Sequence, residues 1–240
     1  MIAVLDVGFP QGIITAKHWQ EIARPAAYPV RGVYCRCGNG NNLPDQTYAA
    51  NVQGAQTAGL AVGPYAVGFP LPLSAPHPGR DPKTQALMHW QASKGVGSNA
   101  GHLPPALDLE WPAPMDWLKW AIGSASVRAW TRDYLAEAAR LWKRSPVLYL
   151  YPDFWTHLAR GATDAELEQL GEYDLWLARY AVVMPGTLAG GKWGAPTLWQ
   201  KSDGGGRLPS GAPVDEDVFV GDEISWKEFR GLAPVTARNA

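Results

Sequence analysis

The sequence predicts an α/β fold, an irregular (β/α) TIM-like barrel that forms a single domain, and three observations support this. Short apolar segments typical of strands alternate with segments of helical periodicity, which favours a largely parallel sheet covered by helices. The length of 240 residues is ordinary for one α/β barrel, and no linker or internal repeat divides it. The helices expected late in the chain are short or missing, so a regular eightfold barrel is not expected.

The individual elements follow from local patterns of apolar residues. The clearest helix, residues 127–143, places Trp130, Tyr134 and Leu141 on one face at helical spacing, and Gly59 stands where a preceding helix should end. The expected strands are residues 2–6, 30–37, 61–67, 106–110, 146–151, 174–180, 196–200 and 214–219. The expected helices are residues 16–24, 46–58, 83–93, 127–143 and 154–158, and the Gly- and Pro-rich segments 70–82 and 201–213 are expected to be loops.

Composition excludes several classes of function. The net charge is -1 with acids and bases interspersed, which is not the pattern of a nucleic-acid-binding protein or a polybasic membrane anchor. No apolar run is long enough to span a membrane, and residues 2–5 read as a strand, so we expect synthesis in the cytoplasm without a signal peptide. Cys35 and Cys37 lie two residues apart on one strand, where they are poorly placed to bond each other, and are expected to be reduced thiols. We expect no metal and no cofactor, because the acids lack His neighbours at ligand spacing.

The most informative segment is Leu107-Asp108-Leu109-Glu110. Residues two apart on a strand share a face, so Asp108 and Glu110 should point one way while the leucines pack on the other side. Two adjacent carboxylates repel unless one holds a proton or both have partners, and such pairs are typical of glycoside hydrolysis.

Two further acids, Asp6 and Asp215, lie at other predicted strand ends. Active sites of α/β barrels lie at the C-terminal ends of the strands, so these acids can converge with Asp108. The alternatives are that Asp6 caps a turn and that residues 215–217 form an exposed acidic edge. The 12 tryptophans suit packing in a barrel, and some of them suit stacking on sugar rings.

A series of motifs follows in order from about residue 2 to residue 222. They are Asp6-Val7 with Gln11-Gly12, Trp19, Arg36-Cys37-Gly38-Asn39-Gly40, Asn51 with Ala55, residues 58–65, Leu107-Asp108-Leu109-Glu110, residues 146–149, residues 175–180, Trp199-Gln200, and residues 214–221. Together these motifs resemble glycoside hydrolase family 25, the lysozymes that cleave bacterial peptidoglycan. Two positions depart from the family pattern: Ala66-Val67 replaces a His-Phe pair, and Glu216-Asp217 replaces an uncharged pair.

The resemblance implies an irregular catalytic barrel over residues 1–232, and residues 233–240 are expected to be a flexible C-terminal tail. It implies that the chain cleaves the β-1,4 bond between N-acetylmuramic acid and N-acetylglucosamine. Glu110 would be the general acid, with its pKa raised by burial and by the charge of Asp108. Asp108 would also orient the N-acetyl group, and Asp6 and Asp215 would complete the catalytic set. The candidate sugar contacts are Tyr65, Tyr149, Trp176, Tyr180 and Gln200, with Arg36 either contacting substrate or pairing with an acid of the cleft.

The expected partner is the glycan strand of peptidoglycan, met at the bacterial cell wall after release, by a monomer that binds neither nucleic acid nor membrane. Two other functions stay open: a chitinase-like substrate-assisted glycosidase, and a wall-binding phage component without catalysis. The sequence also leaves open whether the anomeric configuration is retained or inverted.

Overall fold

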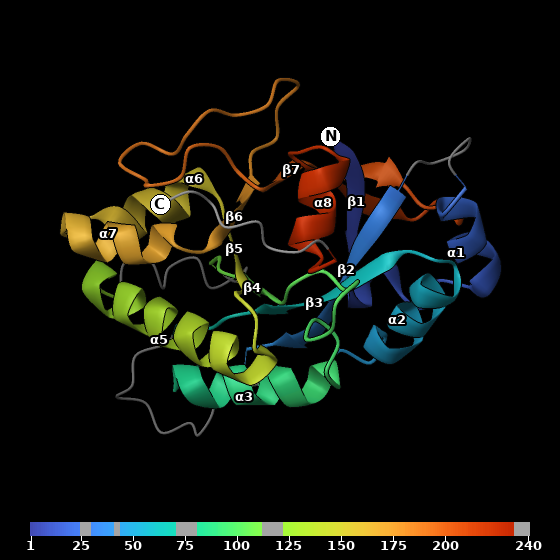
Figure 1. Ribbon diagram of the computed structural model, residues 1–240, viewed down its shortest axis with the longest axis horizontal. Helices are drawn as coiled ribbons and strands as arrows, with labels where there is room; N and C mark the ends of the chain where they lie inside the picture. Colours follow the sequence, from blue (N-terminus) through green and yellow to red (C-terminus); the bar gives the residue numbers. More distant parts are fainter. Residues whose placement is uncertain (25–29, 41–43, 71–80, 112–121, 233–240) are drawn as a thin grey trace.

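The computed structural model describes residues 1–24, 30–40, 44–70, 81–111 and 122–232. Within these ranges the strands close into one barrel in chain order, β1-β2-β3-β4-β5-β6-β7-β8 (Figure 1). Neighbouring strands from β1 to β7 are parallel, whereas β8 runs antiparallel to both β7 and β1. The predicted fold class, an irregular (β/α) barrel, is therefore confirmed.

The predicted strands and helices are all present; the strand over residues 61–67 has the predicted bounds, and the others begin or end at different residues. The strands are β1 (Ile2–Val7), β2 (Val30–Asn39), β3 (Ala61–Val67), β4 (Ala106–Asp108), β5 (Val147–Leu150), β6 (Asp174–Ala178), β7 (Leu198–Arg207) and β8 (Pro213–Phe219). The helices are the 3₁₀ turn η1 (Phe9–Gln11), α1 (Ala16–Ile22), α2 (Tyr48–Thr57), α3 (Pro82–Ser93), α5 (Ser124–Trp142), α6 (Pro152–Ala159), α7 (Asp164–Gly171) and α8 (Glu223–Phe229). Residues 71–80 of the predicted loop and the tail 233–240 lie outside the described residues.

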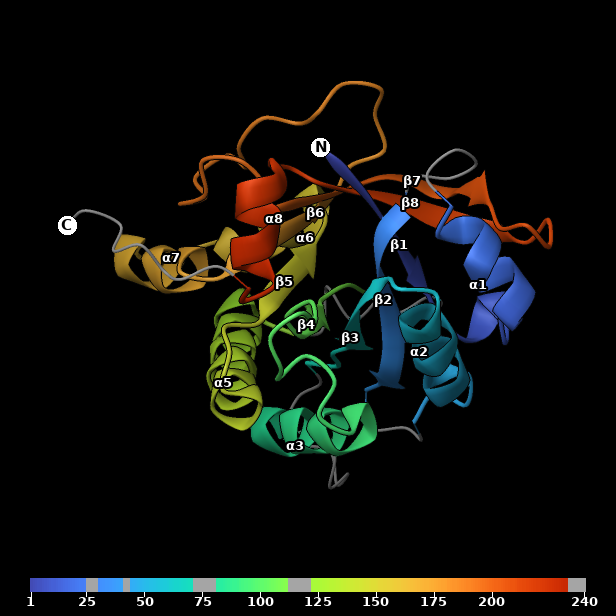
Figure 2. The ribbon, with the colours of Figure 1, turned by 45° about the vertical axis from the view of Figure 1, so that its right-hand side comes forward.

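The prediction of a loop over residues 201–213 is wrong for residues 201–207 and confirmed for residues 208–212. Strand β7 continues to Arg207, because this Gly-rich segment still pairs with β8, Gly206 opposite Val214 and Arg207 opposite Pro213. Shifts of register between Gln200 and Gly206 accommodate the extra residues. The two strands form a long ribbon that extends past the barrel toward α1 (Figure 2).

Helices α7 and α8 were not predicted, although their first residues carry recognisable caps. The Thr163 side chain accepts from the backbone N–H of Glu166, and the Glu166 carboxylate accepts from the Thr163 N–H at 2.8 Å. Asp222 caps α8 in the same way, through the N–H groups of Ile224 and Ser225. Both caps satisfy N–H groups that the first turn of a helix leaves without partners.

One end of the barrel is filled by large apolar side chains. Trp226 of α8 is fully buried there, 5.1 Å from the Phe219 ring of β8 between ring centres. A Cβ atom at Gly32 of β2 would come within 2.9 Å of the Trp226 ring, so glycine makes room for this plug. Further along the interior, the rings of Tyr34 and Trp176 lie 4.7 Å apart. Among the described residues, the acidic side chains of the interior gather at the opposite end of the barrel.

A second apolar layer lies between the strands and the surrounding helices, where α3 and α5 run side by side (Figure 1). Cys35 and Cys37 face this layer from β2, and both are buried free thiols, as predicted. Burial raises the pKa of each thiol, which leaves both groups neutral. None of the described helices combines the length and the apolar character needed to cross a bilayer.

Candidate active site

A polar cavity of about 250 Å³ opens at the C-terminal ends of the parallel strands. All of the site residues predicted from the sequence line it, namely Asp6, Arg36, Tyr65, Asp108, Glu110, Tyr149, Trp176, Tyr180, Gln200 and Asp215. The remaining lining residues are Pro10, Gln11, Val67 and Asp203. Segments that are far apart in the sequence thus contribute side chains to one site.

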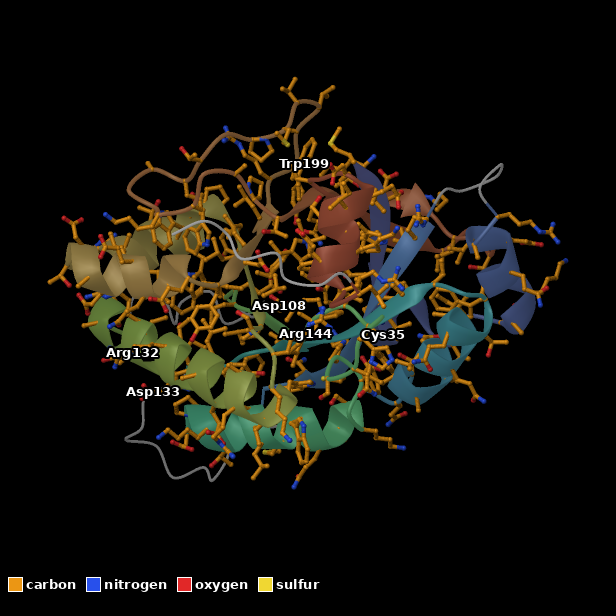
Figure 3. All side chains as sticks on the ribbon, viewed as in Figure 1. Cys35, Asp108, Arg132, Asp133, Arg144 and Trp199 are labelled. Atoms are coloured by element: carbon orange, nitrogen blue, oxygen red, sulfur yellow. The ribbon has the colours of Figure 1, made fainter. Side chains whose placement is uncertain are left out.

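The alternation of β4 brings Asp108 and Glu110 into the cavity together. Strand β4 ends at Asp108, two residues before the predicted end. Its pattern continues nevertheless, because the Leu109 N–H donates to the Tyr149 carbonyl at 3.0 Å and the Leu109 side chain is buried in the outer layer. Glu110 therefore emerges on the same side as Asp108, which lies near the middle of the molecule (Figure 3).

The reversed direction of β8 brings its first residues to the cavity. Asp215 is paired in register with Asp6 of β1, and its Oδ1 accepts from the Gly204 N–H at 2.6 Å. Gly204 has a φ of +62°, a left-handed conformation that favours glycine.

Asp217, two residues beyond Asp215, is 2% exposed and accepts from Trp176 Nε1 at 2.8 Å. The alternative of an exposed acidic edge is wrong for this residue. The alternation rule applied above to Asp108 and Glu110 would have found it, since Asp215 and Asp217 also share a strand face.

Gln200 connects the acids of β1 and β8 to two tyrosines. Its Nε2 donates to Asp6 Oδ2 at 3.1 Å and to Asp215 Oδ2 at 3.3 Å. Its Oε1 accepts from the hydroxyls of Tyr149, at 2.9 Å, and Tyr180, at 3.4 Å. Both ends of this buried amide are thus satisfied, which fixes the positions of the two carboxylates.

The carboxyl groups of Asp6, Asp108, Glu110 and Asp215 hold protons more tightly than carboxyls in water. Burial raises the pKa of Asp6 to about 7, and the nearby charge of Asp215 adds to the effect. Burial, followed by repulsion from Glu110, raises the pKa of Asp108 well above its usual range. Burial also raises the pKa of Glu110, with contributions from the charges of Asp203 and Asp215 rather than from Asp108 as expected.

Aromatic side chains line the cavity in two different environments. Trp176 is 2% exposed and packs edge-on against Tyr65 and Tyr149, at 6.3 Å and 5.2 Å between ring centres. Tyr180 exposes 59% of its surface at the cavity mouth. Tyr180 is therefore free to stack on a sugar ring, while Trp176 mainly supports the wall of the cavity.

Asp203 was not among the predicted site residues, because its segment was expected to be a loop, and a loop has no regular side-chain alternation. Within the described ranges, no group of three or more His, Cys, Asp and Glu side chains is arranged to hold a metal ion.

An acidic cavity at this end of a barrel, containing carboxyl groups with raised pKa values, is the kind of site that glycosidases use. The model of the family described as Glycosyl hydrolases family 25 matches residues 5–207, and the chain belongs to this family. It is accordingly a glycosidase. No curated protein sequence matches the chain significantly.

Solved structures of similar fold come from bacteria, fungi and phages. The bacterial lysozyme from Streptomyces coelicolor is 22% identical, with a TM-score of 0.78 over 97% of this chain and 98% of that one. A family 25 lysozyme from Aspergillus fumigatus is also 22% identical, with a TM-score of 0.76 over 95% of this chain and 98% of that one. The catalytic domain of an endolysin from a Listeria monocytogenes bacteriophage is 20% identical, with a TM-score of 0.64 over 96% of this chain and 98% of that one. At these identities the likeness concerns the fold.

Proposed function

We propose that this chain is a lysozyme of bacterial peptidoglycan that hydrolyses the β-1,4 bond between N-acetylmuramic acid and N-acetylglucosamine. Residues 1–232 would form the catalytic barrel, acting at the cell wall. The observation that carries the proposal is the position of Glu110 beside Asp108, on one side of an acidic cavity that Tyr180 and other aromatic residues border. The similar structures described as lysozymes, muramidases and endolysins support the choice of peptidoglycan.

Glu110 would be the general acid that protonates the glycosidic oxygen. It is less buried than Asp108, so its carboxyl group is the one that a glycosidic oxygen reaches from the open side. Its raised pKa keeps a larger fraction protonated near neutral pH than an ordinary glutamate would have. Proton donation to the leaving oxygen is therefore available at the moment the bond breaks.

Asp108 would assist by binding the acetamido group of the substrate. Its Oδ1 is buried and has no hydrogen-bond partner among the described residues. A substrate N–H donated to this oxygen would stabilise the ionised form of Asp108 and lower its pKa. Because the two carboxyls repel each other, ionised Asp108 would then favour a proton on Glu110, where the reaction needs it.

Mass spectrometry of muropeptides after digestion of peptidoglycan tests this proposal. We expect new reducing ends on N-acetylmuramic acid, and a loss of about 100- to 10,000-fold in rate for Glu110→Gln, the usual contribution of general acid catalysis. Glu168→Gln is the matched control, because Glu168 lies on α7 with a side chain that is 65% exposed.

Other products would indicate other functions. Reducing ends on N-acetylglucosamine would indicate a glucosaminidase, and faster cleavage of chitin oligomers would indicate a chitinase-like enzyme. Binding to peptidoglycan without any new reducing ends would indicate a wall-binding protein and would contradict the proposal.

A further inference from the structure

We propose that Arg36 binds a carboxylate carried by the muramyl unit of the substrate, and so selects peptidoglycan over uncharged glycans. This inference rests on the proposed function, because it concerns the substrate of the same cavity. It is drawn from the charge of the cavity wall, the way Arg36 is held, and the nitrogen atoms that this leaves available.

Arg36 is unusual among the residues that line the cavity because of its charge. The acidic lining residues are Asp6, Asp108, Glu110, Asp203 and Asp215. Among the described residues of the lining, Arg36 alone is positively charged. A substrate carboxylate is repelled by ionised acids, so within this cavity it is favoured beside Arg36.

The guanidinium group of Arg36 is anchored through one of its three nitrogens. Nε donates to Asp45 Oδ2 at 2.8 Å, and the side chain of Arg36 is 18% exposed while that of Asp45 is 1% exposed. No described residue accepts a hydrogen bond from Nη1 or Nη2 of Arg36. The outer edge of the guanidinium therefore presents two donors, the geometry that binds a carboxylate through both oxygens.

Asp45 acts as a positioning residue for this edge. Its Oδ1 accepts from the backbone N–H and hydroxyl of Thr47, and its Oδ2 accepts from the Phe9 N–H as well as from Arg36. Burial alone would raise the pKa of Asp45, but the bonds from Thr47, Arg36 and Phe9 outweigh it and lower the pKa. Asp45 thus stays ionised. It links Arg36 to Phe9 at the start of η1 and to Thr47, the residue that precedes α2.

Gly8 provides the space in which Arg36 lies. A Cβ atom at this position would come within 3.1 Å of both Cβ and Nε of Arg36. A side chain there would press on the guanidinium and move it. Arg36 is therefore fixed before substrate arrives, which reduces the conformational entropy lost on binding.

A muramyl unit carries carboxylates from two sources. Without a stem peptide, the lactyl group ends in a free carboxylate. With a stem peptide, that carboxyl is an amide and the peptide supplies carboxylates instead. The chemistry offered to Arg36 is the same, so the experiment must separate the two sources.

Three versions of one glycan oligomer provide the test. The first carries stem peptides, the second has them removed to free the lactyl carboxylate, and the third has that carboxylate converted to a methylamide. The kcat/KM of the wild type should be about 10- to 100-fold higher for at least one carboxylate-bearing version than for the methylamide, the range expected for a charged, bidentate hydrogen bond. Preference for the first or the second version identifies the source.

Arg36→Met should bring this ratio close to one, mainly by raising KM for the charged substrate. Asp45→Asn, which keeps the shape of the anchor but removes its charge, should lower the ratio less. Arg31→Met is the matched control, because Arg31 lies on the same strand in an exposed ion pair with Glu223, its side chain 46% exposed. The control should keep the wild-type ratio.

Equal rates of the wild type on all three substrates, or an unchanged ratio in Arg36→Met, would overturn the inference. If the wild type cleaves none of the three, the proposed function itself fails. If Arg36→Met does not fold, the salt dependence of the wild type decides: the ratio should shrink as salt rises, because ions screen a charge pair at a partly open site. A ratio that does not change with salt would contradict a role for Arg36.

Discussion

Trp176 of β6 donates a hydrogen bond of 2.8 Å from Nε1 to Oδ1 of Asp217, an acid of β8 that lies behind the cavity. The other oxygen of Asp217 is buried without a hydrogen-bond donor among the described residues. Burial, followed by the charge of Asp6, raises the pKa of Asp217 well above its usual range. These causes favour the protonated form of Asp217, and the interaction of its side chain with Asp6 acts in the same direction, raising the pKa of Asp217 and lowering that of Asp6.

Asp217→Asn should make the folded protein less sensitive to rising pH. An acid whose pKa is raised by folding stabilises the fold below its unfolded pKa, and this stability is lost as pH rises toward the folded pKa, by up to about 1.4 kcal/mol per pH unit for one proton. The amide keeps the acceptor for Trp176 and the donor for Asp6 without needing a proton. Thermal unfolding between pH 4 and pH 8 measures the effect, and we expect a flatter curve for the variant.

The control for this measurement is Asp133→Asn. Asp133 lies on the outer side of α5 next to Arg132, far from Asp108 (Figure 3), and its side chain is 46% exposed. It should follow the wild-type curve. A fall in unfolding temperature as steep in Asp217→Asn as in the wild type would show that Asp217 is already ionised.

Asp203→Asn should shift the alkaline side of the pH–activity profile to lower pH. After burial, the charge of Asp203 is the first contribution that raises the pKa of Glu110. A general acid works only while protonated, so activity falls as pH rises through its pKa, and a lower pKa moves this fall to lower pH. The measurement is kcat/KM on soluble glycan across the pH range. The exposed Asp153→Asn is the control, and an identical profile for both variants would exclude this role of Asp203.

Gln200→Met should destabilise the fold by about 1–3 kcal/mol, the usual cost of leaving buried polar groups without partners. Methionine fills similar space but removes the donor to Asp6 and Asp215 and the acceptor for Tyr149. Activity should also fall, because the two carboxylates lose the amide that positions them. Urea unfolding at pH 7 measures stability, compared with Gln53→Met at an exposed position of α2. Equal stability of the two variants would contradict this interpretation of the network.

Trp226→Ala should cost about 3–5 kcal/mol of unfolding free energy, the range for removing a large buried aromatic side chain. The indole is fully buried between the barrel and α8, where it packs against Phe219 and Phe229. Because this plug lies at the far end from the cavity, the folded variant should keep most of its activity at low temperature. Ile224→Ala on the same helix, 67% exposed, should change stability little. A similar loss in both variants would mean that α8 does not close the barrel.

Much of the fold could be predicted because its signals are local. Alternation along short apolar segments identified the strands, and the paired carboxylates at Asp108 and Glu110 identified one wall of the cavity. The rest depended on pairing between distant segments. Strand β7 extends through glycines that have little strand propensity of their own, and it is ordered by its ladder with β8.

The same reason explains which site residues were missed. Asp203 lies on the extension of β7, so its direction followed from pairing rather than from local sequence. The alternation of side chains along β8 could have predicted that Asp217 shares a face with Asp215. Its hydrogen bond with Trp176 could not be predicted in this way, because Trp176 lies 41 residues earlier in the chain. The charges that raise the pKa of Glu110 are those of Asp203 and Asp215. Their distances from Glu110 are set by the tertiary fold and cannot be deduced from the sequence spacing of Asp108 and Glu110.

The antiparallel course of β8 also determines where attachments to this protein can be made. Ile2 pairs with Phe219, so the first strand starts and the last strand ends beside the Trp226 plug, on the side opposite the cavity. A fluorescent tag or an additional wall-targeting module, tethered at residue 1 or after residue 232, would leave the mouth of the cavity open to long glycan strands.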